Sequence, residues 1–371
     1  MAISPDVLAT ALVDLMPSYS ELFTTWHPLF QKMVEKGNIE RKVLQGPFRE
    51  FAVVTAGPGQ VTQISTGSEV IAGGRTQAAT RGNAFAPRLI YAFDVPGKDL
   101  SEANGEMDLA RIIQHYPELA MSDLHERISQ QLASGNGNGV GGFLTLNGQT
   151  TYDPGAPGGP RTGAIEFLTP AAQAAAGNVV FGLNKANVAG WVNQFGQSTS
   201  FATNGRSIMR QTYLACARQQ MTMGAPDLLL GDELSYLNYL EDLDTQVRIV
   251  TDTTEGGDRA PKKIRRGIKF LDSDFYLEDS ITANAAPFVA PALIVGAPPV
   301  SGGVIYMLNT NTWHGFTMGH DSKIETTGDF AVRGPFRLPE QDLWRYEIVL
   351  AMGLNTTQLR CNGAVCGTAI P

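Results

Sequence analysis

The sequence predicts an α+β protein, with an arm, a long hairpin and a long helix followed by mixed helix and sheet. Two observations lead to this class. Apolar residues recur every three or four positions, as in amphipathic helices, over residues 5–36, 107–134 and 206–221. Runs rich in β-branched and aromatic residues, which favour strands, occupy residues 49–54, 88–95, 304–308 and 344–354.

Composition limits the function classes. With 371 residues the chain can form two or three domains, and 43% apolar with 17% charged residues is typical of a folded protein. A net charge of −8 argues against a dedicated nucleic-acid reader, because phosphate contacts require clustered Lys and Arg. The chain shows no signal-peptide pattern, and its most apolar window, 285–299, is too short and proline-rich to span a bilayer. We therefore expect a soluble, cytoplasmic protein with no membrane partner.

The first hundred residues predict two segments that need another surface. The helical spacing of 5–36 is broken at Pro17 and Pro28, and this arm packs either on its own domain or on a neighbouring subunit. The strands 49–54 and 88–95 bracket a polar tract at 57–82, which suggests a long hairpin. Since an isolated hairpin is marginally stable, we expect it to project onto another subunit.

The longest helical pattern, 107–134, contains Pro117 and ends at the glycine run 135–139. That run is not a phosphate-binding loop, because no Gly-Lys-Ser/Thr follows it and no strand precedes it. We interpret it as a helix stop.

A helix–strand–helix over 203–250 is predicted to organise the second half of the chain. Thr203 or Asn204 should cap a helix that starts near Arg206, and residues 227–230 should be a buried strand. One face of the first helix should be buried, with Met209, Tyr213, Cys216, Ala217 and Met221. Asp232 should cap the second helix, whose apolar positions are Leu234, Leu237, Leu240 and Leu243. Strands at 268–271, 304–308, 330–333 and 344–354 complete the sheets.

The sequence contains no set of residues typical of an enzyme, a cofactor site or a metal site. The five histidines (His27, His115, His125, His314 and His320) are scattered, and no serine stands in a nucleophile elbow. Cys361 and Cys366 are predicted to be free thiols, as is Cys216, since three cysteines suit a reducing compartment. The acidic group Asp272, Asp274, Glu278 and Asp279 lacks the spacing of a calcium loop and is interpreted as strand-edge carboxylates.

One basic stretch, 259–266, is open to three interpretations. It is a solvated loop, an inter-subunit salt-bridge surface, or, third in rank, a DNA contact. No aromatic residue lies within it to stack on bases, which disfavours the last.

The order of elements resembles the major capsid proteins of tailed bacteriophages, the family with the Hong Kong 97-type coat fold. The similarity is strongest over 190–281. There 189–193 (Ala-Gly-Trp-Val-Asn) is similar to the family's Trp-x-Asn segment, and 225–231 with the helix containing Tyr236, Tyr239 and Leu240 is similar to its helix–strand–helix. Residues 267–272 followed by 305–309 are similar to the strand pair that comes next.

The resemblance implies a domain division: an N-terminal arm (1–40), an extended loop (41–97), a peripheral domain with the spine helix (98–200), an axial domain (201–325), and a return to the peripheral domain with the C-terminal end (326–371), whose last residues rejoin the axial domain. It implies no catalytic, cofactor or metal residue.

The expected partners are further copies of the chain in hexamers, pentamers and an icosahedral shell, portal and scaffolding proteins, a cement protein, and weakly contacted double-stranded DNA. The expected location is the virion, after assembly in the bacterial cytoplasm. An encapsulin shell is the alternative, and a cytosolic hydrolase a remote one.

Two departures from the family matter. Some relatives cross-link their shells through a lysine of the extended loop, but this chain has no lysine between Lys42 and Lys98. We therefore expect no such bond from the loop tip. Some relatives also begin with a cleaved scaffolding segment, whereas the arm here follows Met1 almost directly, so the scaffold is expected to be a separate protein or to have been removed.

Overall fold

The computed structural model describes residues 27–43, 48–54, 79–85, 88–98, 119–120, 122–129, 132, 164–177, 179–188, 190–218, 224–244, 268–278, 289–290, 300–301, 303–318, 326–327, 330–338 and 342–367. Within these ranges the chain forms two six-stranded sheets with helices against them, which confirms the α+β class. The arm before residue 27, the glycine run 135–139 and the basic stretch 259–266 lie outside the described residues. No helix of the described ranges is both long and apolar enough to cross a membrane.

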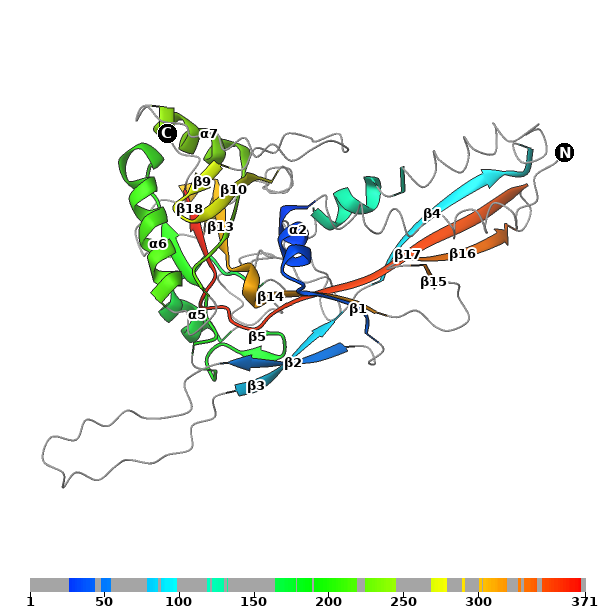
Figure 1. The fold of residues 1–371 in the computed structure, drawn as a ribbon, viewed down its shortest axis with the longest axis horizontal. Helices are drawn as coiled ribbons and strands as arrows, with labels where there is room; N and C mark the ends of the chain where they lie inside the picture. The colour runs from blue at the N-terminus through cyan, green and yellow to red at the C-terminus, as the bar shows by residue number, and fades with distance from the viewer. Residues whose placement is uncertain are drawn as a thin grey trace, which may run out of the picture.

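One six-stranded sheet, here called the long sheet, is organised around the 14-residue strand β17 (Leu343–Thr356). The first part of β17 lies between β4 and β16, and its last part pairs with β14. Figure 1 shows β17 running away from the rest of the molecule with β4 and β16 beside it. Tyr346, Ile348 and Leu350 are fully buried, but Val349 and Ala351 are buried as well, so the alternation expected around the first three residues does not extend beyond Ile348. The other strands of the long sheet are β1 (Ile39–Val43), β4 (Arg88–Pro96), β14 (Trp313–Met318), β15 (Thr326–Thr327) and β16 (Phe330–Arg337).

A helical segment covers one face of the long sheet. Residues 119–120, 122–129 and 132 are helical and confirm the described part of the helix predicted over 107–134. Asp123 hydrogen-bonds Tyr91 of β4, and burial together with this carboxylate raises the pKa of the tyrosine. The side of the helix that joins the core of the long sheet consists of residues four apart, Ala120, Leu124, Ile128 and Leu132.

The second six-stranded sheet, here called the compact sheet, has the order β7-β18-β13-β8-β10-β9. All four residues of β8 are buried between β13 and β10, which confirms the buried strand predicted at 227–230. The last described strand, β18, lies inside this sheet, between β7 and β13. Its strands are β7 (Gln194–Gln197), β8 (Leu228–Gly231), β9 (Ile268–Phe270), β10 (Ser273–Leu277), β13 (Val304–Leu308) and β18 (Gly363–Cys366).

The two faces of the compact sheet belong to different cores. Leu229 and its neighbours on one face pack with the helices α6 (Arg206–Arg218) and α7 (Glu233–Asp244). Leu228 and Leu230 point to the opposite face and join the core of the long sheet. This alternation follows from the period of two along a strand, and it places β8 between the two cores.

Three local predictions in this region were wrong. Thr203 and Asn204 do not cap α6, because both lie within a π-helical turn, η1 (Phe201–Gly205), that leads directly into it. The strands β9 and β13 are not neighbours, since β8 and β10 separate them. Leu234 and Leu237 of α7 are exposed; the helix instead buries Ser235 and Tyr239. The aromatic packing of Tyr239 on Phe270 and Phe275 decides which side of α7 faces the sheet.

The hairpin exists, but its second strand differs from the prediction. β2 (Phe48–Val54) pairs antiparallel with β3 (Ala79–Phe85), a strand that begins inside the polar tract. The run at 88–95 forms β4 and pairs with β17 at nine positions instead. The local pattern could not show that β3 pairs with β2 and β4 with β17, because strand pairing depends on partners that the local pattern does not contain.

Short elements complete the described chain. Helix α2 (Pro28–Glu35) begins at Pro28, which occupies the first turn, and Thr169 caps α5 (Pro170–Ala176). Phe181 and Gly182 have positive φ angles of 56° and 75° and connect β5 (Val179–Val180) to β6 (Leu183–Asn184) in a tight turn. The remaining elements are β11 (Val289–Ala290), β12 (Val300–Ser301) and the 3-10 turn η2 (Thr310–Thr312).

Candidate functional site

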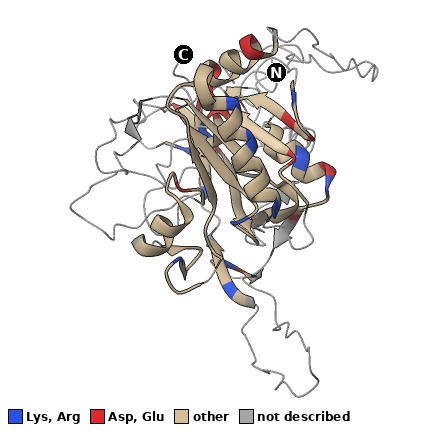
Figure 2. Cartoon of the chain, turned by 90° about the vertical axis from the view of Figure 1, so that its left-hand side faces the viewer, with Lys and Arg blue, Asp and Glu red and all other residues tan. Residues whose placement is uncertain are grey.

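The described residues contain no catalytic or metal-binding cluster. His27, His125 and His314 lie on separate elements, and no group of three potential metal ligands occurs in the described ranges. Cys216, Cys361 and Cys366 are buried and form no disulfide within the described residues, as predicted for the thiols, and burial raises the pKa of Cys366 to about 12. Buried thiols of raised pKa are unreactive at neutral pH. Figure 2 shows acidic and basic positions interspersed over the described elements on the visible side.

The predicted acidic group is divided among different roles. Asp272 is exposed in the turn between β9 and β10, whereas Asp274 and Glu278 each contact a basic group of α2. Asp279, His115 and His320 lie outside the described residues. The interpretation as strand-edge carboxylates missed that two of these acids bind the N-terminal helix, because nothing local links residues so far apart.

The base of the β2–β3 hairpin is fixed by aromatic packing. Phe51 of β2 meets Phe181 edge to face with ring centroids 5.1 Å apart, and Phe181 lies 6.2 Å from Trp191. The amide of Asn83 in β3 donates to the carbonyl of Phe181 at 2.9 Å. The described base of the hairpin is therefore anchored to the β5–β6 turn.

The Trp-x-Asn segment is a buried structural centre. The Trp191 indole donates to the carbonyl of Val180 at 3.3 Å. The Asn193 side chain donates to the carbonyl oxygens of Glu166 and Gln194 at 2.8 and 3.0 Å, and accepts from the Glu166 amide at 2.9 Å. These bonds join three chain segments, which explains why an amide side chain is required at this buried position.

A fully buried ion pair lies beside Asn193. Lys185 Nζ and Glu166 Oε1 are 3.0 Å apart, and both side chains have 0% exposure. Gln173 accepts from Lys185 Nζ at 3.2 Å and donates to the carbonyl oxygens of Leu168 and Asn193. No periodic pattern in the sequence marks this pair.

The two sheets are joined at a polar junction between residues 309–312 and 357–362. The first segment connects β13 to β14 and the second connects β17 to β18. Asn362 links them, because its Oδ1 accepts from Asn309 N at 2.8 Å and Trp313 Nε1 at 2.9 Å, while its Nδ2 donates to Thr312 Oγ1 at 3.1 Å. The amide of Thr357 donates to the carbonyl of Thr312 at 2.9 Å. The two connecting segments thus form one hydrogen-bonded unit.

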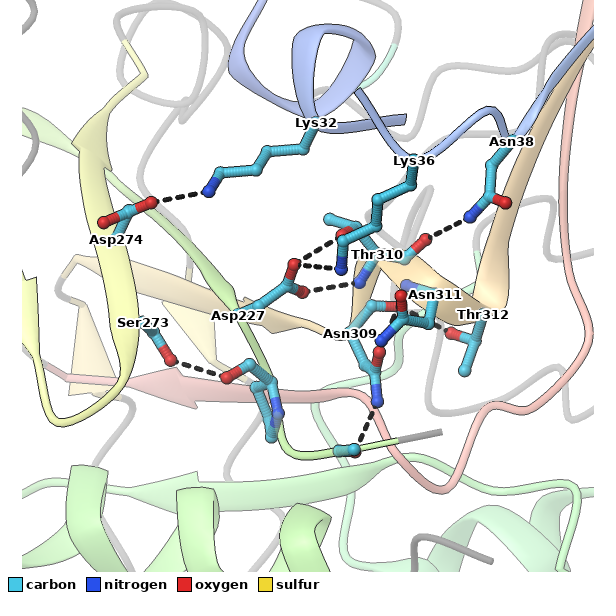
Figure 3. Close-up of polar contacts among 12 residues, drawn as sticks. Lys32, Lys36, Asn38, Asp227, Ser273, Asp274, Asn309, Thr310, Asn311 and Thr312 are labelled. Atoms are coloured by element: carbon cyan, nitrogen blue, oxygen red, sulfur yellow. Dashed lines mark hydrogen bonds and ion pairs between the residues drawn. The ribbon is translucent and has the colours of Figure 1, made fainter. Parts of the chain in front are cut away.

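Helix α2 bridges the junction with charged side chains (Figure 3). Lys32 Nζ lies 2.6 Å from Asp274 Oδ2 on β10, and Lys36 Nζ lies 2.5 Å from Asp227 Oδ2, just before β8. The carboxylate of Asp227 also accepts from Thr310 N and Thr310 Oγ1, at 2.7 and 2.6 Å. The helix is therefore tied both to the compact sheet and to the junction itself.

The N-cap of α2 makes the third contact. His27 is buried, its Nδ1 accepts from the Leu29 amide at 3.2 Å, and its Nε2 faces Glu278 Oε2 at 3.1 Å. The buried apolar side of α2 consists of Leu29, Phe30 and Met33.

Comparison with known proteins gives a result at the level of structure alone. No protein-family model matches the sequence, and no curated protein matches it. The Cyanophage A-1(L) capsid subunit is similar over 90% of this chain and 92% of its own, with a TM-score of 0.52 and 13% identity. The SrpI encapsulin from Synechococcus elongatus aligns over 92% and 88%, with a TM-score of 0.45 and 9% identity.

The cyanophage similarity spans both sheets, so it concerns the whole architecture and not one embedded motif. With its two six-stranded sheets and this similarity over most of its length, the chain has the Hong Kong 97-type coat fold.

Proposed function

We propose that the chain is the major capsid protein of a tailed bacteriophage, which assembles through hexamers and pentamers into an icosahedral head around double-stranded DNA. The observation that supports this most is the capsid similarity over 90% of the chain. In this proposal the long sheet with its helix is the peripheral domain, and the compact sheet with α6 and α7 is the axial domain. Along the chain, the boundaries we propose are those given by the resemblance: 1–40, 41–97, 98–200, 201–325 and 326–371. The sheets cross these boundaries, because β4 and β14 belong to the long sheet and β7 and β18 to the compact sheet.

Assembly would proceed by repeated contacts between identical chains. Head-to-tail contacts close into rings when the rotation per subunit allows it, and these rings would be the capsomers. The β2–β3 hairpin, whose base is fixed on Phe181 and Trp191, would extend from the body to cover a neighbour. Each contact is modest, with about 25 cal/mol per Å² of buried apolar area, so stability would come from their number.

The charge of the chain fits a container and not a DNA-binding surface. A protein with net charge −8 would hold DNA without the tight, salt-dependent binding that many phosphate contacts produce. Portal and scaffolding proteins, and a cement protein, are proposed as further partners. The shell would form in the host cytoplasm and become part of the virion.

Electron microscopy of the purified protein tests the proposal. We expect capsomers or closed polyhedral particles, and a chain that stays monomeric at high concentration would contradict a shell function. Nuclease-protected double-stranded DNA in native particles supports a phage coat. Protein cargo without DNA would instead identify an encapsulin shell.

A second test concerns covalent cross-links. Because the chain has no lysine between Lys42 and Lys98, detergent and heat should release single chains from assembled particles. A persistent ladder of covalent oligomers on a denaturing gel would show that the prediction is wrong.

A further inference from the structure

Helices α6 and α7 pack over opposite ends of one face of the compact sheet. A Cβ added at Gly196 of β7 or at Gly363 of β18 would contact Thr212, so α6 covers that end of the sheet. At the other end, Tyr239 of α7 packs on Phe275 of β10. Figure 1 shows α6 next to β18, and α7 next to β9 and β10. The outer sides of the two helices are therefore two separate surfaces of the molecule.

The outer side of α6 is basic, with a leucine at its centre. Arg210, Leu214 and Arg218 are exposed and follow one another at intervals of four residues, so they lie along one side of the helix. Met209 and Cys216, on the side that faces the sheet, are fully buried. The helix contains no acidic residue. We call Arg210, Leu214 and Arg218 the basic stripe.

The outer side of α7 has the same spacing and the opposite charge. Glu233, Leu237 and Glu241 are exposed, again at intervals of four residues, and we call them the acidic stripe. Leu234, which precedes Leu237 by about one turn, is exposed as well. The helix contains no basic residue. Each stripe thus has a leucine between two like charges whose positions are about 12 Å apart along the helix.

We propose that the basic stripe of one copy of the chain packs against the acidic stripe of the next copy in a ring. Leu214 is then covered by Leu234 and Leu237 of the neighbouring copy. The arginines face the glutamates whether the two helices run parallel or antiparallel, because both stripes have the same symmetric order. Since the stripes are different surfaces of the chain, the contact is head-to-tail and repeats around a ring. The inference rests on the proposed capsid function, in which this is a contact within a capsomer.

Charge complementarity identifies the partner as a second copy of the chain. A nucleic acid fits the basic stripe only and leaves the exposed leucines of α7 uncovered. Exposed ion pairs add little binding energy, but like charges prevent α6 from packing on α6 and α7 on α7. Two helices about 20 Å long form a small surface beside the roughly 1,200–2,000 Å² of a stable interface. The contact therefore selects which surfaces meet, in a ring to which further contacts contribute.

Exchange of the charges tests the contact. The first variant, Arg210→Glu with Arg218→Glu, makes both stripes acidic. The second, Glu233→Lys with Glu241→Lys, makes both stripes basic. Either variant alone should form rings at least about tenfold less than the parent in native mass spectrometry, because like charges meet at every contact. The control is Arg127→Glu, a charge reversal at an exposed position of the helix on the long sheet, and it should form rings as the parent does.

An equal mixture of the two charge variants should recover six-membered rings. In such a ring the variants alternate, so opposite charges meet at every contact. Five-membered rings should stay absent from the mixture, because alternation closes only with an even number of copies.

Cysteine cross-linking tests the contact without complete rings. Leu214→Cys and Leu237→Cys, introduced in separate chains, lie at the centres of the two stripes and meet in either helix direction. Mild oxidation of the mixture should give a disulfide-linked pair on a non-reducing denaturing gel, and neither variant alone should give one. The native cysteines are buried and do not compete. This measurement also decides the matter if a charge variant fails to fold, as judged by circular dichroism.

The proposed contact would be wrong if a folded charge variant formed rings as well as the parent, if the mixture of charge variants recovered none, or if the cysteine mixture stayed unlinked. Particles formed by the parent would then still support the capsid function. Loss of DNA binding in the arginine variant, with its rings intact, would assign the basic stripe to nucleic acid instead. Cross-linked pairs without capsomers or particles of the parent would support the contact and contradict the capsid function.

Discussion

The buried pair of Lys185 and Glu166 allows a quantitative prediction. Replacing Lys185 by Met keeps the length of the side chain but removes the ammonium 3.0 Å from Glu166 Oε1, at a site with 0% exposure. Breaking a buried pair from one side costs about 3–5 kcal/mol, because a charge stays buried without its counter-ion. A domain has a total stability of about 5–15 kcal/mol, so this single change should remove a large part of it.

Urea unfolding of the unassembled subunit, followed by circular dichroism, measures this cost. The double variant Lys185→Met with Glu166→Gln carries no buried charge, and it should recover most of the lost stability. Arg206→Met is the matched control at a partly exposed pair and should cost less than about 1 kcal/mol. A loss below about 1 kcal/mol in Lys185→Met, or a double variant no more stable than the single one, would refute the reasoning.

Three further predictions concern packing and charge. Leu230→Asp places a charge in the fully buried β8 and should give insoluble or unassembled protein; normal particles in microscopy would contradict the burial. Gly196→Ala adds a Cβ that overlaps the Thr212 hydroxyl and lies 2.7 Å from Ile208, so thermal unfolding should show a loss of about 1–3 kcal/mol, partly restored by Thr212→Ala. The hydrogen bonds and charge of Arg345 lower the pKa of Asp94 below its ordinary 3.8, so Asp94 stabilises the fold above that pH and the contribution is lost as the pH falls through the lowered pKa. The difference in urea midpoint between the parent and Asp94→Asn should therefore shrink in acid, and a constant difference would contradict it.

Individual helices and strands were predicted better from the sequence than the partners with which they pair. The burial of β8 and of Met209, Tyr213 and Cys216 on the inner side of α6 was predicted and confirmed, since each depends on a local pattern. Ala217 is only partly buried, and Met221 lies outside the described residues. Cys361 and Cys366 form no disulfide among the described residues, as predicted. The predicted pairing of 49–54 with 88–95 was wrong, because the true partner, β3, begins inside a tract that has no strand-like pattern, while β4 pairs with the distant β17.

The contacts between α2 and the compact sheet could not be derived from the sequence. Lys32 and Asp274 are 242 positions apart, and Lys36 and Asp227 are 191 apart. Each reads locally as an ordinary charged residue. The one available signal was the group of acids near 272–279, which marked an acidic strand edge but not the helix that covers it.

The sequence alone determined the secondary structure of the strongly periodic segments, the lack of an enzyme-like residue set and the order of elements typical of a coat protein. Those properties follow from residues close together in the chain, where helix and strand periodicity act directly. The tertiary structure decided which strand completes the hairpin, which side of α7 faces the sheet, and how α2 holds the two sheets together. These depend on pairing, burial and charge between residues brought together only by the folded chain, and a local pattern contains no information about such partners.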